Sequence, residues 1–400
     1  MICSAEFNLR YDRIREFLNK NDLGALLAFS PAMEHKWLQT GHVSYLSGWA
    51  NHDRLGNSVV VVPANGKVVL LFEGLSYMIE QAAEVSPIED IRTVSSVDPN
   101  AVSVHVEGGG IGGFAGETLE ILGENGLAGK PVGVVGIEAM PIRCYEAIRN
   151  GLGNQFREID DIVAELRSIK TADEIEALRQ AAHLSDLGFE TMLEMARPGM
   201  RGIELVAEME RVARRLGADH AKYWMASGPP PDWNDVRLDI KPHDRVLQDG
   251  DLMGACSYIV YKGYWCHGHR AGALGRMPTE TKPLFDLTRR AQDRGLAKVK
   301  PGTTIGEVVE AIGQTASEGG LPMMDRAGHG IGMDYSEQPV PVNKSNKIRL
   351  VAGMTMVIHS IFELPGTGNM FVPYGDVIHV TDNGPELLMQ FPNTAFIAGQ

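Results

Sequence analysis

The sequence has 400 residues, of which 44% are hydrophobic, and it carries a formal net charge of −14. This length provides for two domains with separate cores, and the acidic balance argues against nucleic acid as a partner, because phosphate binding needs a basic surface. No apolar run is long enough to span a bilayer, no signal peptide is recognisable, and the four cysteines lack the spacing of a disulfide framework. We therefore expect a cytoplasmic protein without a membrane partner.

The first part of the chain alternates between helix-like and strand-like segments. An amphipathic helix is expected at 11–21. Short apolar runs predict buried strands, at 25–29, 58–62, 67–72 and 132–137. Such alternation is typical of an α/β domain.

A glycine-rich run lies at 108–113 in this part of the chain. It satisfies the pattern G-x-G-x-x-G between a strand-like stretch at 102–106 and a helix-like stretch at 117–122, and Glu138 follows at a loosely suitable distance. These features permit a dinucleotide-binding interpretation. A six-residue run with five glycines matches such a pattern easily, so we keep this interpretation only as a rival.

The character of the sequence changes near residue 169. A helix is expected at 160–170, and Thr171 and Glu174 form a capping box that starts a second, long helix. Pro198 and Gly199 end that helix. We therefore predict an N-terminal domain at 1–168 and a C-terminal domain at 169–400.

The second part contains an internal repeat. A Pro-Gly pair at 198–199 precedes an amphipathic helix at 205–216, and another pair at 301–302 precedes a helix at 305–316. Two related helix pairs would cover one curved sheet. The strands of that sheet are predicted at 252–260, 264–271, 355–360 and 377–381.

Short motifs along the whole chain resemble the creatinase, prolidase and methionine aminopeptidase superfamily. The motifs are SYLSG at 44–48, SIKTADEI at 168–175, GDL at 250–252, GHGIG at 328–332 and AGM at 352–354. Their order and spacing together are specific. The resemblance implies an α/β N-terminal domain plus an α+β pita-bread (creatinase/aminopeptidase) C-terminal domain, assembled as a homodimer.

Active members of that superfamily place five metal ligands in this frame: two Asp, one His and two Glu. By position these ligands fall on Cys256, His267, His329, His359 and either Tyr374 or Gly375. Every carboxylate is therefore replaced. Because a dinuclear site needs bridging carboxylates to hold two cations, we expect an atypical member that is not a peptidase.

Two interpretations of the histidines remain open. In the first, His267, His329 and His359 bind one divalent transition metal, zinc or iron, with Cys256 as a fourth ligand or neighbour. In the second, the site holds no metal, and these histidines together with His269 serve as general acid and base. We favour the metal over its absence. A third interpretation makes the histidines packing groups of a dead site.

Several residues are expected to bind the substrate. Arg54 falls where creatinase has an arginine that holds the substrate carboxylate from the second subunit, and a guanidinium fork suits a carboxylate. Aromatic residues are expected around the pocket, where they could hold an onium cation, although tryptophans are more often core residues. They are Trp224, Trp233, Tyr258 and Tyr374.

The functional expectation is a hydrolase of small-molecule catabolism. It would cleave a C–N or similar bond in a small polar substrate that bears a carboxylate, and its partners would be that substrate and a second copy of the chain. One alternative is a lyase acting on a small onium or carboxylate substrate. Another is a catalytically inactive pita-bread protein that only binds.

Overall fold

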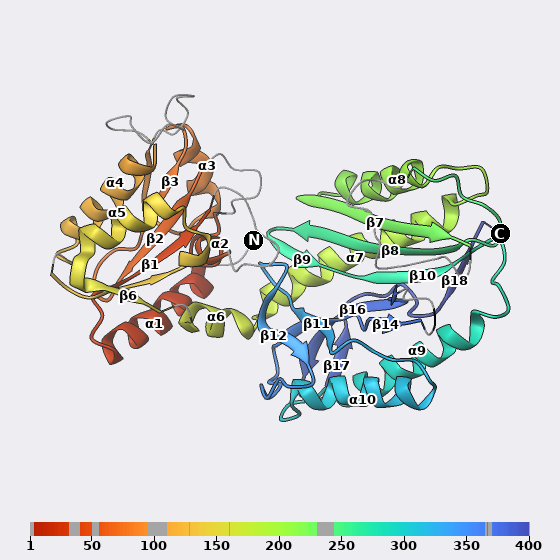
Figure 1. Ribbon diagram of the computed structural model, residues 1–400. Coiled ribbons are helices and arrows are strands. Elements are labelled where there is room, and N and C mark those ends of the chain that lie inside the picture. The colour runs from red at the N-terminus through yellow and green to blue at the C-terminus, as the bar shows by residue number, and fades with distance from the viewer. Residues whose placement is uncertain are drawn as a thin grey trace. The chain divides into compact units, whose positions relative to one another are not determined.

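The computed structural model of the chain describes residues 4–31, 41–49, 56–94, 110–127, 129–159, 161–229, 244–364, 366 and 370–399. The chain divides into two compact units, Met1–Arg167 and Ser168–Gln400 (Figure 1). Among the residues so described, no helix is both long and apolar enough to cross a membrane.

The first unit is built on a six-stranded sheet with the strand order β4-β3-β2-β1-β5-β6. Neighbours β1–β2 and β2–β3 are antiparallel, and the other three pairs are parallel. The strands are β1 (Ala25–Ser30), β2 (Ser58–Pro63), β3 (Val69–Glu73), β4 (Asp90–Val94), β5 (Val132–Val135) and β6 (Phe156–Glu158). The four predicted strands are therefore present, and β4 and β6 were not anticipated.

Helices lie on both faces of this sheet (Figure 1). Buried residues of β1, β2, β3 and β5 pack with those of α4 and α5 in one core cluster, whereas α1 and α2 contact β1 and β2. The helices are α1 (Ser4–Lys20), α2 (His42–Ser47), α3 (Met78–Val85), α4 (Gly110–Glu124), α5 (Ile142–Leu152) and α6 (Asp161–Ser168), with short 3-10 turns η1 (Ile137–Ala139) and η2 (Gly153–Gln155). The first helix thus begins earlier than predicted.

The structure describes only part of the glycine-rich run. The strand-like stretch 102–106 and the first glycines of the run lie outside the described residues. From Gly110 onward the chain is already helical, as the start of α4. The later glycines of a dinucleotide fingerprint lie at the start of the helix, so the dinucleotide-binding interpretation stays a prediction.

The second unit contains a ten-stranded sheet with the central order β12-β11-β13-β16-β10-β8-β7. These strands are β7 (His220–Gly228), β8 (Leu252–Tyr261), β10 (His269–Leu274), β11 (Arg326–Gly330), β12 (Glu337–Asn343), β13 (Thr355–Ile358) and β16 (Tyr374–Thr381). The attached strands are β9 (Tyr264–Cys266), β17 (Gly384–Leu387) and β18 (Phe396–Ala398), and a separate two-stranded sheet holds β14 (Phe362–Glu363) and β15 (Met370–Phe371).

Two helix pairs accompany this sheet (Figure 1). The first pair is α7 (Ala172–Met195) with α8 (Gly202–Arg215), and the second is α9 (Lys282–Leu296) with α10 (Ile305–Glu318). The predicted capping box at Thr171 and Glu174 starts α7, and an equivalent box at Thr304 and Glu307 starts α10. Helix α9 lies before the Pro-Gly pair at 301–302, where the repeat implied a first helix without bounds.

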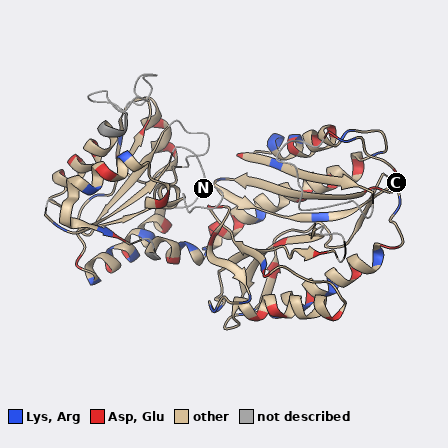
Figure 2. Cartoon of the chain, in the orientation of Figure 1, with Lys and Arg blue, Asp and Glu red and all other residues tan. Residues whose placement is uncertain are grey.

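Residues of alternate parity on the strands face opposite sides of the large sheet. The hydroxyl of Ser185 in α7 donates a hydrogen bond to the hydroxyl oxygen of Ser257 in β8 at 2.7 Å, and the hydroxyl of Tyr223 in β7 donates to the Ser185 carbonyl oxygen at 2.9 Å. The helices therefore cover the face that these two strand residues share. Figure 2 shows charged residues mainly on the helices of this unit, while the strands are largely tan.

Candidate metal centre

One cross-strand row of the sheet carries most of the residues singled out in the sequence. Trp224 lies opposite Cys256, Cys256 opposite His269, and His269 opposite Gly375. Directly opposed residues of antiparallel strands share a face. Trp224 follows Tyr223 and Cys256 precedes Ser257, and successive strand residues point to opposite faces. The row therefore lies on the face of the sheet that is turned away from α7.

His329 and His359 belong to the same face. His329 of β11 lies opposite Val357 of β13, and His359 follows Val357 by two positions. His267 lies between β9 and β10, where the strand predicted at 264–271 is interrupted at His267 and Gly268. The interruption does not remove His267 from the other histidines, since its ring centroid lies 5.7 Å from that of His329 and 5.0 Å from that of His359.

These three histidines form a group that could hold a metal ion. One ligand atom from each of His267, His329 and His359 lies within 4.8 Å of the other two. Zinc–nitrogen bonds are about 2.0–2.1 Å long, so two nitrogens on one tetrahedral ion lie roughly 3.4 Å apart. Closing the group around an ion therefore needs movements of roughly 1.4 Å or less.

Backbone hydrogen bonds fix which nitrogen of two rings can face an ion. His329 Nδ1 lies 2.9 Å from the Gly330 carbonyl oxygen, and His267 Nδ1 lies 2.9 Å from the Ser257 carbonyl oxygen. A carbonyl only accepts, so each Nδ1 carries the proton and each Nε2 keeps its lone pair. Such a second contact is the usual way in which a metal-binding histidine is oriented.

The same nitrogens are buried. Nε2 of His329 and Nε2 of His359 are each inaccessible to solvent and have no hydrogen-bond partner among the described residues, although the His359 residue as a whole is partly exposed. Burial lowers the pKa of His329 to about 4. Burial, and then the neighbouring His267 and His329, hold the pKa of His359 well below its usual range. Both rings are therefore neutral at physiological pH, as metal binding requires.

Cys256 lies beside this group. Its Sγ is 3.5 Å from Nδ1 and 3.9 Å from Nε2 of His267, and the residue is buried. It does not belong to the three-residue group whose ligand atoms all approach one another. The structure thus places Cys256 beside His267.

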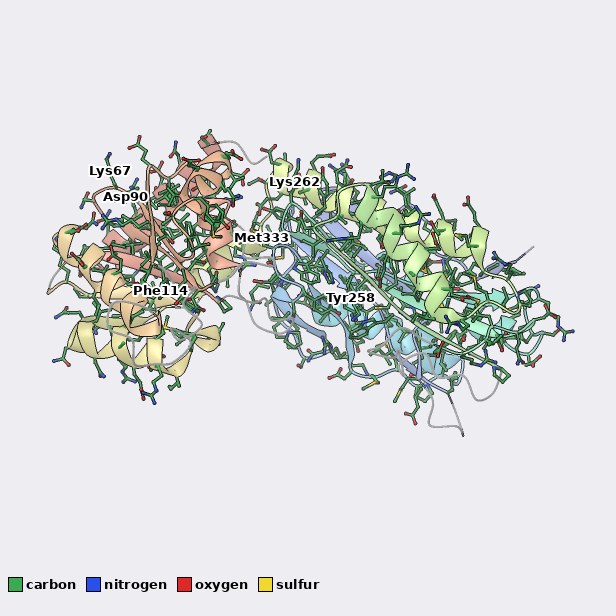
Figure 3. The ribbon with its side chains drawn as sticks, turned by 90° about the horizontal axis from the view of Figure 1, so that it is seen from above. Lys67, Asp90, Phe114, Tyr258, Lys262 and Met333 are labelled. Atoms are coloured by element: carbon green, nitrogen blue, oxygen red, sulfur yellow. The ribbon has the colours of Figure 1, made fainter. Side chains whose placement is uncertain are left out.

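Aromatic rings cover the histidines on one side. Tyr335 has its ring centroid 4.4 Å from that of His329 and 5.1 Å from that of His267. Tyr258 stacks on Tyr335, with ring centroids 5.4 Å apart, and contacts Trp224 in a tilted arrangement, with ring centroids 4.7 Å apart. Tyr258 lies toward the middle of the second unit (Figure 3). Tyr258 and Trp224 were expected near the site, whereas Tyr335 was missed. Its place shortly after the GHGIG motif was the available signal.

Gly375 and Tyr374 have different surroundings. A Cβ on Gly375 would lie 2.9 Å from the His269 Cβ and 3.0 Å from the His359 Cβ, so Gly375 faces the histidines. Tyr374 packs instead in the core under α9, with its hydroxyl 3.5 Å from the Phe285 carbonyl oxygen. The structure does not bring Tyr374 to the site, because alternation turns it to the opposite face.

Two predicted substrate-binding residues, Arg54 and Trp233, lie outside the described residues. His269 is buried in the cross-strand row, and it acts electrostatically on His359. Glu363, four residues beyond His359 in the sequence, is exposed in the small β14–β15 sheet.

Comparisons with known proteins agree with this architecture. The model of metallopeptidase family M24 matches residues 176–382, and that of the creatinase/prolidase N-terminal domain matches residues 10–169. A solved Xaa-Pro dipeptidase from Bacillus anthracis superposes with a TM-score of 0.78 at 22% identity, covering 98% of this chain and 99% of that one. The predicted fold, a creatinase-type N-terminal domain followed by a pita-bread domain, is confirmed.

Curated relatives are named as peptidases. The chain is 31% identical to the uncharacterized peptidase YqhT of Bacillus subtilis over 60% of this chain and 67% of that protein. It is 26% identical to the Xaa-Pro dipeptidase of Pyrococcus furiosus over 58% of this chain and 66% of that protein. These names favour a peptidase over the non-peptidase enzyme that was expected from the exchanged ligands.

Proposed function

The chain belongs to metallopeptidase family M24, and on this premise we propose that it is a hydrolase that uses one divalent transition-metal ion, zinc or iron, held by His267, His329 and His359. The observation that carries the proposal is the convergence of the three ligand atoms within 4.8 Å of one another. The reaction proposed is cleavage of a C–N bond in a small molecule that bears a carboxylate.

Peptide bonds are the first C–N bonds to consider. A peptide bond is itself an amide, and relatives of the chain are named as dipeptidases. Dipeptides are small and carry a terminal carboxylate, so they meet both parts of the proposal. Amides and amidines of small carboxylic acids outside the peptides are the second class, favoured because the ligand set differs from that of the peptidases.

The residues at the superfamily's ligand positions fit one ion rather than two. Bridging of two cations is the task of carboxylates, and the positions carry Cys256, His267, His329, His359 and, from its orientation toward the histidines, Gly375. Within the described residues, no Asp or Glu joins the group. A neutral three-nitrogen set is instead a known arrangement for a single catalytic ion.

The chain supplies the environment for such an ion. When bound, the ion would polarise a substrate oxygen and lower the pKa of a water molecule. Ser257 and Gly330 orient two of the ligands through their carbonyl groups. Tyr335 and Tyr258 exclude solvent from one side of the rings. Arg54 remains the predicted carboxylate-binding residue, contributed by the second subunit of a proposed homodimer.

Metal analysis and product analysis together test this proposal. We expect the protein, stripped with a chelator and reloaded with Zn²⁺ or Fe²⁺, to retain one ion per chain after desalting. The loaded protein should release amine from Xaa-Pro and other dipeptides, or from small amides, with incorporation of oxygen from labelled water.

The variants His329→Ala and His359→Ala should lose both the ion and the activity, whereas His183→Ala, an exposed position on α7, should keep both. Products without the label would favour the alternative lyase. Failure of the wild-type protein to retain any ion would refute the metal proposal, and turnover by that metal-free protein would instead support acid–base catalysis by the histidines. If the protein neither retains an ion nor turns over a substrate, the remaining alternative is a catalytically inactive protein that only binds.

A further inference from the structure

A buried ion pair lies where the second unit begins. Lys170 directly precedes the N-cap of α7, and its ammonium group donates to Oε1 of Glu337, the first residue of β12. The two side chains are only 1% and 2% exposed. Replacement of a buried ion pair by apolar residues of similar volume is often neutral for stability. Stability alone therefore does not explain why the fold carries this pair.

The other oxygen of Glu337 holds the loop 331–336, which joins β11 to β12. Oε2 accepts a hydrogen bond from the backbone amide of Asp334 at 3.2 Å. The loop is buried apart from Ser336, which is half-buried, and Met333 marks it in Figure 3. A buried backbone amide needs an acceptor inside the protein. The Glu337 carboxylate supplies one, so it links Lys170 to the middle of the loop.

The next residue of the loop, Tyr335, packs against the histidines. Its ring centroid lies 4.4 Å from that of His329 and 5.1 Å from that of His267. The amide that Glu337 holds is that of Asp334, immediately before Tyr335. The hydrogen bond from this amide therefore fixes the backbone from which the Tyr335 ring reaches two of the proposed ligands.

Glu337 is also joined to a ligand through its own backbone. It is paired with Gly330 in the antiparallel ladder of β11 and β12. The Gly330 carbonyl oxygen accepts from His329 Nδ1 at 2.9 Å, and such a carbonyl belongs to the outer shell that orients a metal-binding imidazole. Glu337 thus reaches His329 by two routes, through Tyr335 and through Gly330.

We propose that Glu337 is a positioning residue of the candidate metal centre: its carboxylate fixes the loop 331–336 so that Tyr335 packs against His329 and His267. Lys170 supplies the counter-charge that offsets the cost of burying this carboxylate. The placement of Tyr335 is a property of the metal-free chain. The consequence for an ion rests on the proposed function, because release of Tyr335 leaves the two imidazole rings free to turn away from the geometry that an ion requires.

Two double variants separate the hydrogen bond to the loop from the ion pair. Lys170→Met with Glu337→Gln removes both charges but keeps an acceptor oxygen for the Asp334 amide. Lys170→Met with Glu337→Met removes both charges and the acceptor, at similar side-chain volume. Because both proteins lose the same ion pair, we expect the Tyr335 ring to leave His329 only in the second.

Histidine-ring NMR spectra of the metal-free proteins measure where Tyr335 lies. An aromatic ring whose centroid is 4.4 Å away shifts the signals of His329, and Tyr335→Ala defines their position without that ring. The signals are assigned by their loss in His329→Gln. The double variant with Glu337→Gln should keep the wild-type signals, whereas the one with Glu337→Met should move most of the way to those of Tyr335→Ala. A merely structural ion pair would give the same signals in both.

A chelator competition with Zn²⁺ measures the consequence for the ion. The double variant with Glu337→Met should bind Zn²⁺ about tenfold more weakly, or worse, than the one with Glu337→Gln. Urea denaturation of both proteins serves as the control for folding, since loss of a shared ion pair should affect their stability alike.

Gly332→Ala displaces the carboxylate without removing a charge, and it replaces the double variant with Glu337→Met if that protein does not fold. The new Cβ would lie 2.2 Å from Glu337 Oε1, the movable end of a side chain, so the carboxylate must shift. The His329 signals should then move as well. Gly123→Ala on α4, where a Cβ meets nothing within 4 Å, should leave them in place.

The outcomes keep this inference apart from the proposed function. Wild-type His329 signals in Gly332→Ala and in the double variant with Glu337→Met would overturn the inference, and so would equal signals or equal Zn²⁺ affinities in the two double variants. If the wild-type protein binds no Zn²⁺ while the His329 signals respond as expected, the proposed metal function fails and the positioning of Tyr335 by Glu337 stands.

Discussion

The guanidinium of Arg270 donates a hydrogen bond to Asp376 Oδ1 at 2.7 Å, and both side chains are almost completely shielded from solvent. Arg270 also donates to the carbonyl oxygens of His269 and Gly375, at 2.9 and 2.7 Å. This ion pair therefore ties together the backbones of two strands directly behind the cross-strand row. The structure thus pairs Arg270 with an acidic neighbour inside the fold.

Removal of the acidic partner should be strongly destabilising. We expect Asp376→Asn to lower the free energy of unfolding by about 3–5 kcal/mol, because it leaves a buried guanidinium without its counter-charge. Urea denaturation of the two proteins measures this difference. Glu89→Gln removes one partner of the exposed Lys67–Glu89 pair and should leave stability unchanged. Equal effects of the two variants would show that burial of the Arg270 pair is unimportant.

The proposed metal site predicts that removal of a single ring lowers the number of ions bound per chain. A two-nitrogen remnant holds a divalent ion far less tightly than three nitrogens do. The His267→Ala variant should therefore fall from about one bound Zn²⁺ per chain to a small fraction after desalting, as measured by elemental analysis. Cys256→Ser should retain the ion, since Cys256 is a neighbour and not a member of the ligand group. Loss of zinc from Cys256→Ser would instead make the thiolate a ligand.

Much of the architecture could be predicted from the sequence because its signals are local. Thr171 and Glu174 define a helix start by their own side chains, and buried strands such as β1 and β5 are continuous apolar runs. The repeat implied helix α9 but not its bounds, because its apolar residues are sparse among charged ones and its N-cap residue, Thr281, makes no side-chain capping bond. Strand β11 was missed since its segment, Arg326–Gly330, reads as a glycine-rich motif and not as an apolar run.

The site could be predicted only in part for a related reason. The resemblance to a superfamily brought His267, His329 and His359 together, and their ligand atoms do converge. The resemblance could not decide whether Tyr374 or Gly375 occupies the last ligand position. The two residues differ by one position, and a shift of one position reverses the face of a strand. Tyr335 depends on a loop conformation that positions its ring 4.4 Å from that of His329, and no periodic pattern encodes this contact.

Gly375 provides a test of how closely the row is packed. Substitution by Ala would bring the new Cβ to 2.9 Å from the His269 Cβ and 3.0 Å from the His359 Cβ. Because both contacts are with Cβ atoms, which move only together with their backbones, we expect the histidines to separate and the affinity for Zn²⁺ to fall by about tenfold or more. A chelator competition measures it. Gly116→Ala on α4, where a Cβ meets nothing within 4 Å, should not change zinc affinity. An equal loss of zinc affinity in both variants would contradict a specific effect of Gly375.

The pH dependence of stability should report the buried imidazoles in the metal-free protein. Burial lowers the pKa of His329 from its ordinary 6.5 to about 4. Between these values the unfolded chain binds a proton at this residue and the native protein does not, so the contribution of His329 to stability is intact above pH 6.5. It is lost progressively as the pH falls toward 4.

At pH 5 the loss from His329 alone should be about 2 kcal/mol. We therefore expect urea denaturation to show a smaller decrease in the free energy of unfolding between pH 8 and pH 5 for His329→Asn than for the wild-type protein, by about this amount. The comparison uses the change with pH within each protein, so an overall stability difference between them cancels. His183→Asn, at an exposed position, should retain the wild-type change. If His329→Asn also retains it, His329 is not a buried neutral ring, and the electrostatic basis of metal binding at this centre is wrong.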